Sequence, residues 1–244
     1  MVTTTLSPET FVCDLVTARP ARARVFDRYD IDYYCGGEDS LENIAAKHGI
    51  KLDQILYELQ TIDEATVGTD LIDWLHQSPD MLIDNLLASH HMFTRAEYVR
   101  ITALFQKVMN EPGIDLKDIG ALWESWRTMH AFLSRHQGFE EGVVFPEVKR
   151  ITHMAGVAPL DRSVFNDCLN VVRAEHHRLW ELLGRMKERA HGYVIPQGAS
   201  QNLKDLIAGL REFQANTALH LHKENHVLLR VLKEKVSATQ APSH

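Results

Sequence analysis

Two histidine-glutamate pairs are spaced so that both side chains of each pair lie on one face of a helix. His136 and Glu140 are four residues apart, as are His220 and Glu224, and residues at i and i+4 share a helix face. The shared face is otherwise apolar in both cases, so both carboxylates are predicted to be buried. A buried carboxylate without a strong partner costs several kcal/mol. Both carboxylates therefore need a strong partner, but a His-x-x-x-Glu spacing also occurs by chance, so the two pairs alone do not decide between a metal site and a hydrogen-bonded polar core.

Two further histidines, His91 and His176, stand on the apolar faces of other predicted helices. His91 precedes Pro112, in the first predicted turn, by 21 residues, and His136 follows Asp115, just after that turn, by 21 residues, so these two histidines meet at one level. Similar counts bring His176 and His220 into the same layer, within about one helical turn. The predicted metal ligands are His91, His136, Glu140, His176, His220 and Glu224.

This ligand set predicts two metal ions. Four imidazoles and two carboxylates are too many ligands for one tetrahedral zinc, and they are too rich in nitrogen for calcium or magnesium. Mixed imidazole and carboxylate ligation suits iron or manganese. We expect two iron ions that share an oxo or hydroxo group, with Glu140 and Glu224 as bridges. Each ion then has two histidines and keeps one open position.

The other histidines near these positions are expected to lie outside the cluster. His177 falls off the apolar face and is predicted to be exposed. His90 is less suitable than His91, because stepping from His90 along the helix brings a glutamate into the core. His222 and His226 lie on a flank of the last helix, where we expect exposure, with a supporting position behind the metal ligands as the alternative.

The elements that must position the six ligands are four long amphipathic helices. Turn signals at 111–113, 155–159 and 192–198 divide the second part of the chain into four segments whose apolar residues step by threes and fours. Short connections between long helices predict an all-α, up-down-up-down four-helix bundle. Pro146 should kink the second helix near Gly142. The buried face predicted for that helix carries Ile119, Leu122, Trp126, Met129, Leu133, His136, Glu140 and Val143.

A polar, glycine-bearing run at 66–69 predicts a boundary between two domains. Residues 1–66 are expected to form a small helical domain, and residues 70–236 the bundle. Within the small domain the sequence predicts helices at 8–17 and 19–29, a third opened by Asp39, and a fourth capped by Asp53 that runs to residue 59. Gly36 and Gly37 predict a tight turn. Since all six ligands lie in the bundle, we expect the bundle to bind metal without the small domain.

The composition argues against nucleic acid and membranes as partners, and it predicts the cellular location. The 244 residues include 26 Lys and Arg against 33 Asp and Glu, a net charge of −7, so there is no bulk basic field for nucleic acid. No run approaches 18 apolar residues, so no membrane association is expected. Three widely spaced cysteines, an odd number, predict a reducing cytoplasm. The oligomeric state stays open, with a homodimer as one option.

Several motifs resemble the iron-sulfur cluster repair di-iron proteins (RIC, or ScdA/DnrN/NorA-like) over nearly the whole chain. Their N-terminal signature is similar to Ile31-Asp32-Tyr33-Tyr34-Cys35-Gly36-Gly37. The bundle motifs are His91, His136-x-x-x-Glu140-Glu141 followed by Phe145-Pro146, Glu175-His176, and His220-x-x-x-Glu224-Asn225. The resemblance implies a hemerythrin-like di-iron bundle behind an ScdA-type N-terminal domain, with the same six ligands.

The resemblance also implies a role in nitrosative and oxidative stress. Its expected ligand is nitric oxide or another diatomic, its clients are iron-sulfur proteins, and its electron donor is unknown. Reduction of nitric oxide to nitrous oxide is left open as an enzymatic activity; the alternatives are a non-catalytic nitric oxide or oxygen sink or sensor, and iron donation to apo-cluster proteins. Oxygen-carrying hemerythrins use a fifth histidine four residues after the first in the third helix. That position is Trp180 here, which weakens the oxygen-carrier interpretation.

The chain departs from the family pattern at Tyr34, where the first of two adjacent cysteines is expected. Only Cys35 remains. A vicinal dithiol is therefore excluded, whereas a single thiol can still take part in mixed-disulfide exchange. Cys35 stays a candidate catalytic thiol, with packing of the turn as the alternative, and Cys13 and Cys168 are expected to pack in the core.

Overall fold

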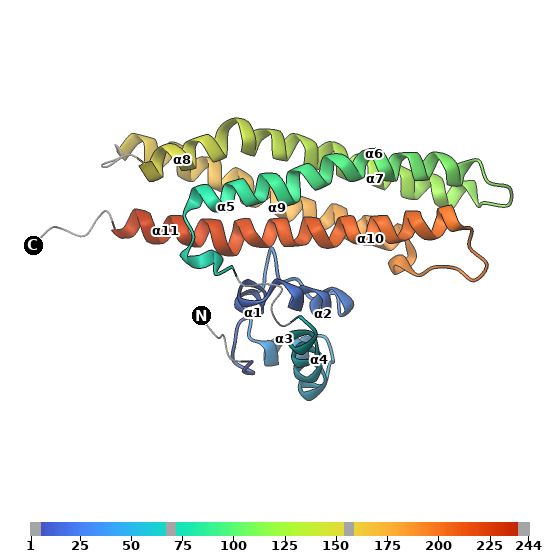
Figure 1. Cartoon of the computed structure of the whole chain (residues 1–244), viewed down its shortest axis with the longest axis horizontal. Coiled ribbons are helices and arrows are strands. Elements are labelled where there is room, and N and C mark those ends of the chain that lie inside the picture. The colour runs from blue at the N-terminus through green and yellow to red at the C-terminus, as the bar shows by residue number, and fades with distance from the viewer. Residues whose placement is uncertain (1–5, 67–71, 154–158, 239–244) are drawn as a thin grey trace, which may run out of the picture. The chain divides into compact units, whose positions relative to one another are not determined.

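The computed structural model describes the backbone of residues 6–66, 72–153 and 159–238. Over these ranges the chain is all-α, and the only extended pairing recorded in them is an isolated bridge between Phe11 and Ser40. The predicted fold class is confirmed: long helices form a bundle and short helices precede it (Figure 1). Among the described helices, none combines the length and the apolar character needed to cross a membrane.

Short helices make up the N-terminal part. They are α1 (Val12–Ala18), the 3-10 turn Pro20–Arg22, α2 (Ala23–Arg28), α3 (Leu41–Lys47) and α4 (Leu52–Ala65). Two predicted caps are wrong. Ser40, not Asp39, caps α3 by accepting from the Asn43 amide at 3.3 Å, and Asp39 pairs with Lys47 instead. Asp53 lies in the first turn of α4.

Helix α4 also ends at Ala65 rather than at the predicted residue 59. Its last turns are held by a partly buried ion pair that the local sequence does not predict. The Arg22 guanidinium donates to both carboxylate oxygens of Asp63, at 3.0 and 2.6 Å, and it also donates to the Leu15 carbonyl. A bidentate arginine-carboxylate pair of this kind fixes α4 against the first helices.

The predicted tight turn is present at residues 32–37, called the Cys35 turn below. Asp32 Oδ1 accepts from the amides of Tyr34 and Cys35 at 3.0 and 2.8 Å, and Asp32 Oδ2 accepts from the Gly36 amide at 2.9 Å. Gly37 has φ +80°, and a Cβ there would lie 2.9 Å from the Tyr33 carbonyl oxygen. Only glycine can close this turn without a clash.

Four long helical stretches follow. They are α5 (Pro79–Leu86) continued by α6 (Met92–Met109), α7 (Leu116–Phe139) continued by α8 (Phe145–His153), α9 (Pro159–Arg189), and α10 (Gln201–His222) continued by α11 (Leu229–Ala238). Short 3-10 turns occur at Trp74–His76 and His191–Tyr193.

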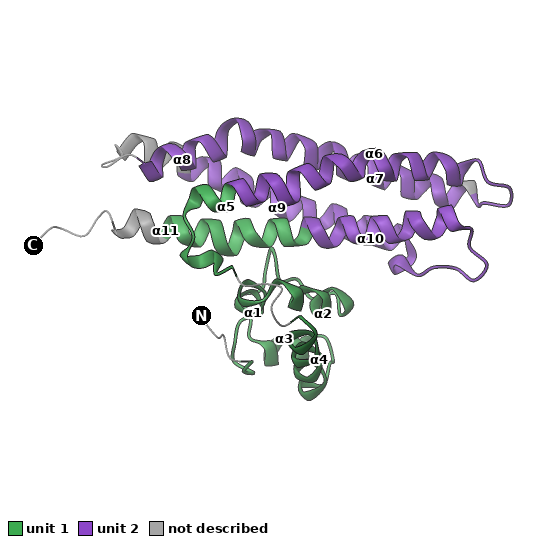
Figure 2. Ribbon diagram, in the orientation of Figure 1, with its two compact units in different colours: residues 1–83, 218–244 green, residues 84–217 purple. Residues whose placement is uncertain are grey.

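The chain divides into two compact units, shown in different colours in Figure 2. Residues 84–217 form one unit, which contains part of each long stretch and is itself a four-helix bundle. Residues 1–83 and 218–244 form the other, so the division falls inside the continuous helix α10. The predicted boundary at 66–69 lies largely outside the described residues, and the domain limits 1–66 and 70–236 stay predictions.

Three of the four long stretches are interrupted by a π-helical turn. These turns are Leu87–His91, Glu140–Val144 and Lys223–Leu228. In each, the residue after the turn donates its amide to a carbonyl five residues back; Phe145, for example, donates to Glu140. The second turn contains Gly142, where a kink before Pro146 was predicted. A π-turn holds one residue more than an α-turn and is a recognised cause of helix bending.

After the second π-turn, one residue predicted to be buried is exposed. Val143, assigned to the buried face, is 44% exposed, whereas its neighbour Val144 is 4% exposed. The extra residue in the π-turn rotates the following helix, so that Val144 takes the place that an unbroken α-helix would give to Val143. The preceding part of the face is buried as predicted, from Ile119 to Glu140.

Candidate metal centre

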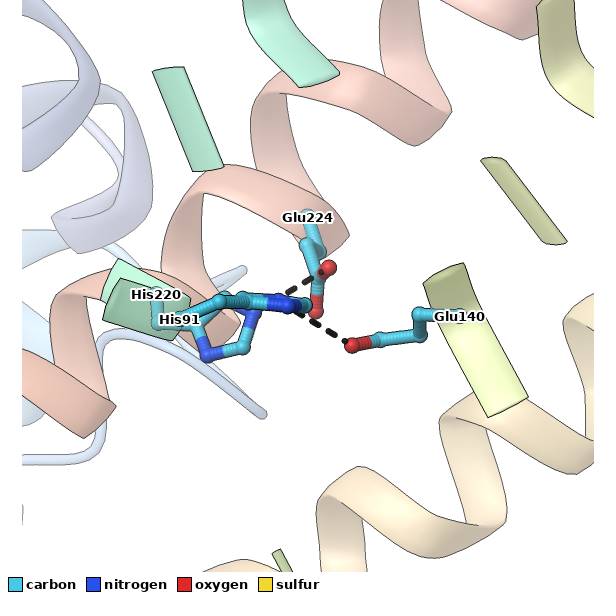
Figure 3. Close-up of side chains that lie close together, drawn as sticks. All are labelled: His91, Glu140, His220 and Glu224. Atoms are coloured by element: carbon cyan, nitrogen blue, oxygen red, sulfur yellow. Dashed lines mark ion pairs between the residues drawn. The ribbon is translucent and has the colours of Figure 1, made fainter. Parts of the chain in front are cut away.

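All six predicted ligands are buried, and the structure brings them together. None of them is more than 3% exposed. Figure 3 shows four of them, His91, Glu140, His220 and Glu224, of which the last two leave the same helical stretch. Every one of the six comes from one of the four long helical stretches, as the periodicity predicted.

Within residues 84–217, three histidines direct their Nε2 atoms at one carboxylate. Glu140 lies 2.9 Å from Nε2 of His136, 3.5 Å from Nε2 of His91 and 3.8 Å from Nε2 of His176. Across the division in α10, the second i, i+4 pair repeats this geometry, since His220 Nε2 lies 3.2 Å from a Glu224 oxygen. Each glutamate therefore faces imidazole nitrogens that a metal ion could bind.

The ligand atoms fall into two groups of four, and within each group all four atoms lie within 4.8 Å of one another. The first group is His91, Glu140, His220 and Glu224, and the second is His136, Glu140, His176 and Glu224. The histidines are thus sorted into two different pairs. The two glutamates belong to both groups.

Two further glutamates orient the histidines, and sequence reasoning gave them no role. Glu141 Oε1 lies 2.7 Å from Nδ1 of His91, and Glu175 Oε2 lies 2.9 Å from Nδ1 of His136. A carboxylate accepts, so each Nδ1 carries the proton and each Nε2 presents a lone pair to the cluster. The one sequence feature that could have indicated this role is position, because each of these glutamates directly neighbours a predicted ligand in the sequence.

An arginine pairs with each of these orienting glutamates. Arg95 contacts Glu141, and Arg135 contacts Glu175 at 3.2 Å. The hydrogen bond from His136, with further help from Arg135, holds the pKa of Glu175 below its ordinary value. Glu175 is therefore ionised at neutral pH and is the stronger acceptor for the histidine proton.

Electrostatics also keep the central carboxylate ionised. Burial raises the pKa of Glu140. The neighbouring imidazoles, above all His136, lower this pKa by more than burial raises it, so that it lies well below its ordinary value. An ionised carboxylate is the form that binds metal.

The π-turns coincide with the ligands. His91 ends the first π-turn, Glu140 begins the second, and Glu224 lies in the third. Such turns are frequent at functional sites. For these three of the six ligands, the widened turn contributes to the direction in which the side chain leaves its helix.

Two family descriptions match the chain. The ScdA_N domain, described as a domain of unknown function (DUF542), matches residues 9–63. The hemerythrin HHE cation binding domain matches residues 81–232, more than half of the chain, and this range includes all six clustered residues. The chain belongs to the hemerythrin HHE family. The family resemblance seen in the motifs is thereby confirmed.

Curated relatives match over most of their length. The sequence is 28% identical over 225 residues to a "Probable iron-sulfur cluster repair protein" of Haemophilus influenzae, covering 91% of this chain and 96% of that protein. It is 25% identical over 226 residues to the iron-sulfur cluster repair protein ScdA of Staphylococcus epidermidis, covering 92% and 98%. It is 24% identical over 215 residues to the iron-sulfur cluster repair protein YtfE of Pectobacterium carotovorum, covering 88% and 92%.

The donor set of this hemerythrin domain fits a metal centre. Imidazole nitrogen together with carboxylate oxygen suits iron or manganese. The site is buried, two of its histidines are oriented by Glu141 and Glu175, and Glu140 is ionised. Trp180, at the position of the additional histidine of oxygen carriers, is 39% exposed, and its ring stacks on His177 with 5.5 Å between ring centroids. His177 is exposed, as predicted.

Two expectations for other histidines of the hemerythrin domain need correction. His222, expected to be exposed, is buried and is hydrogen-bonded to Thr17 and to the Tyr33 carbonyl. His226 is partly buried. His90 is also buried, next to His91, but its Nδ1 faces Asn216 Oδ1 at 3.1 Å and it belongs to neither ligand group.

The environment of Cys35 disfavours a reactive thiolate. Burial, with a contribution from Asp32, raises the pKa of the Cys35 thiol far above its ordinary value. The thiolate is the nucleophilic form, so in this conformation the thiol is a poor nucleophile. Cys13 is buried, as expected for a packing residue, and burial likewise raises its pKa to about 12.

Proposed function

We propose that the chain is a di-iron protein that binds nitric oxide and serves the repair of iron-sulfur clusters. The observation that carries the di-iron proposal is the sharing of Glu140 and Glu224 by both ligand groups. A carboxylate has two oxygens, so one glutamate can serve two ions. With both glutamates bridging, His91 and His220 would complete one ion, and His136 and His176 the other.

The residues of the chain supply orientation and burial. Glu141 and Glu175 hold the Nδ1 protons of His91 and His136, so these imidazoles enter the site as neutral Nε2 ligands. Four neutral imidazoles and two carboxylates leave a pair of iron ions with net positive charge, which an additional oxo or hydroxo bridge would reduce.

The centre would supply two neighbouring open positions for small diatomic ligands, because Trp180 stands at the position of the fifth histidine of oxygen carriers. Nitric oxide fits such a site. Its reduction would consume two molecules, two electrons and two protons to give one nitrous oxide and one water, with the electrons coming from an external one-electron donor. The names of the relatives support the repair role, with iron-sulfur proteins as the proposed clients.

The test uses the full chain purified from its native host. We expect two irons per chain by elemental analysis, and a Mössbauer spectrum of a coupled diferric pair. One metal ion per chain, or zinc in this material, would overturn the di-iron proposal.

A second measurement separates binding from turnover. The reduced protein is titrated anaerobically with nitric oxide, and nitrous oxide is measured by gas chromatography with and without an added one-electron donor. Uptake without nitrous oxide identifies a sink or sensor, and catalytic nitrous oxide production identifies a reductase. Failure to take up nitric oxide contradicts both.

The cytoplasmic location stays a prediction.

A further inference from the structure

The helical segment that carries two of the six ligands has a second set of contacts on its other sides. His220 and Glu224 belong to the metal cluster, whereas His222 and Asn225 contact the Cys35 turn. His222 follows His220 by two residues, about 200° around the helix, so the two rings leave in nearly opposite directions. All these residues belong to the compact unit formed by residues 1–83 and 218–244.

Both ring nitrogens of His222 are used by the N-terminal part of this unit. Nδ1 lies 3.0 Å from the Tyr33 carbonyl oxygen. A carbonyl only accepts, so Nδ1 carries the proton and Nε2 accepts from the Thr17 hydroxyl, also at 3.0 Å. The ring is 2% exposed, and its centroid lies 5.8 Å from that of the fully buried Tyr33 ring. The two hydrogen bonds therefore fix both the tautomer and the orientation of His222.

Asn225 binds the next residue of the turn. Its Nδ2 donates to the Tyr34 carbonyl at 2.7 Å. Three amides of the turn donate to Asp32, whereas the carbonyls of Tyr33 and Tyr34 accept hydrogen bonds from the helix. The contact uses the backbone of Tyr34, so replacing the family's cysteine by tyrosine does not remove it.

We propose that docking of the Cys35 turn on His222 and Asn225 and metal binding at His220 and Glu224 stabilise each other. This inference rests on the metal centre proposed above. Both sites bias the same short helical segment, which includes the π-turn Lys223–Leu228, and a coupling free energy between two sites is reciprocal. His222 and Asn225 are thus positioning residues for the metal ligands, and the Cys35 turn responds to metal occupancy.

The first experiment measures iron release from the full, iron-loaded chain to an excess of an iron chelator under anaerobic conditions. Asn225→Leu removes the donor without changing charge or approximate size. We expect release about tenfold faster, the effect of losing one partly buried hydrogen bond that is fully coupled to metal binding. The matched control is Asn202→Leu. Asn202 lies at the other end of the same helical stretch and donates to Glu111, so its loss should leave the release rate unchanged.

His222 provides a test by rescue. His222→Phe keeps a ring but loses both hydrogen bonds, and should accelerate iron release. His222→Asn keeps a donor near the position of Nδ1 and should restore release toward the parent rate. A general packing defect would not follow this order, because phenylalanine preserves more of the ring's volume than asparagine does.

The reciprocal experiment follows alkylation of Cys35 by peptide mass spectrometry, with Cys168 in α9 as the internal reference. Metal loading should slow alkylation of Cys35 about tenfold relative to Cys168, and Asn225→Leu should abolish this protection. Equal release rates in parent and variants overturn the coupling. Faster release with unchanged metal protection of Cys35 also overturns it. If the parent chain itself binds no iron, that result contradicts the proposed metal centre rather than the coupling alone.

Discussion

Glu175 Oε2 lies 2.9 Å from Nδ1 of His136, although 39 residues separate the two in the sequence. The contact joins α9 to α7 and fixes which imidazole nitrogen faces the metal cluster. Glu141 does the same for His91 at 2.7 Å. His91 and His136 belong to different ligand groups. Each proposed ion therefore has one histidine ligand whose ring is oriented by a hydrogen bond to a carboxylate.

The orienting role predicts a measurable loss of metal affinity. Glu175→Ala should weaken iron binding about 10- to 100-fold, the usual effect of removing such a partner, as measured by competition with a chelator. Glu181→Ala, in the same helix and paired with Arg178 at the surface, is the control and should bind as the parent does. Equal affinities for all three proteins would show that Glu175 has no such role.

Glu140 and Glu224, the proposed bridges, should matter more than any single orienting residue. Glu140→Ala or Glu224→Ala should abolish stable binding of the metal pair, because each removes an oxygen ligand from both groups. Elemental analysis after desalting checks this. A variant that still retains two irons per chain would contradict bridging by that residue.

Adjacent histidines in α9 test which face of this helix binds metal. His176 is buried in the cluster, whereas His177 is exposed and lies 4.0 Å from Glu181. Neighbouring residues differ by about 100° around a helix. His176→Ala should reduce the metal content, and His177→Ala should leave it unchanged; equal losses would mean that the side chains are placed differently in solution.

The register change at the second π-turn predicts opposite behaviour for two adjacent valines. Val144→Asn puts an amide into the core and should destabilise the protein by about 2–4 kcal/mol. Val143→Asn, at an exposed position, should stay within about 0.5 kcal/mol of the parent. Chemical denaturation of the metal-free chain measures both. The reverse order would indicate an unbroken α-helix in this region.

The sequence by itself determined the helical fold class and the six clustered residues. Both depend on local periodicity, since i, i+4 spacing puts His136 beside Glu140 whatever surrounds them. The tight turn at Gly36-Gly37 was also predictable, because Gly37 adopts a backbone conformation that other residues avoid.

Only the tertiary structure decided how the histidines pair and what holds them. The partner of His136 comes from a different helix, and the burial of His222 depends on Thr17 and Tyr33, about two hundred positions away in the chain. The π-turns shift register by one residue, which the apolar pattern cannot distinguish from a continuing α-helix: Val143 and Val144 are both valine, and only packing selects which one is buried. Contacts between distant segments have no local period. Residue counts along the helices therefore give the level at which two side chains lie, but not which atoms touch.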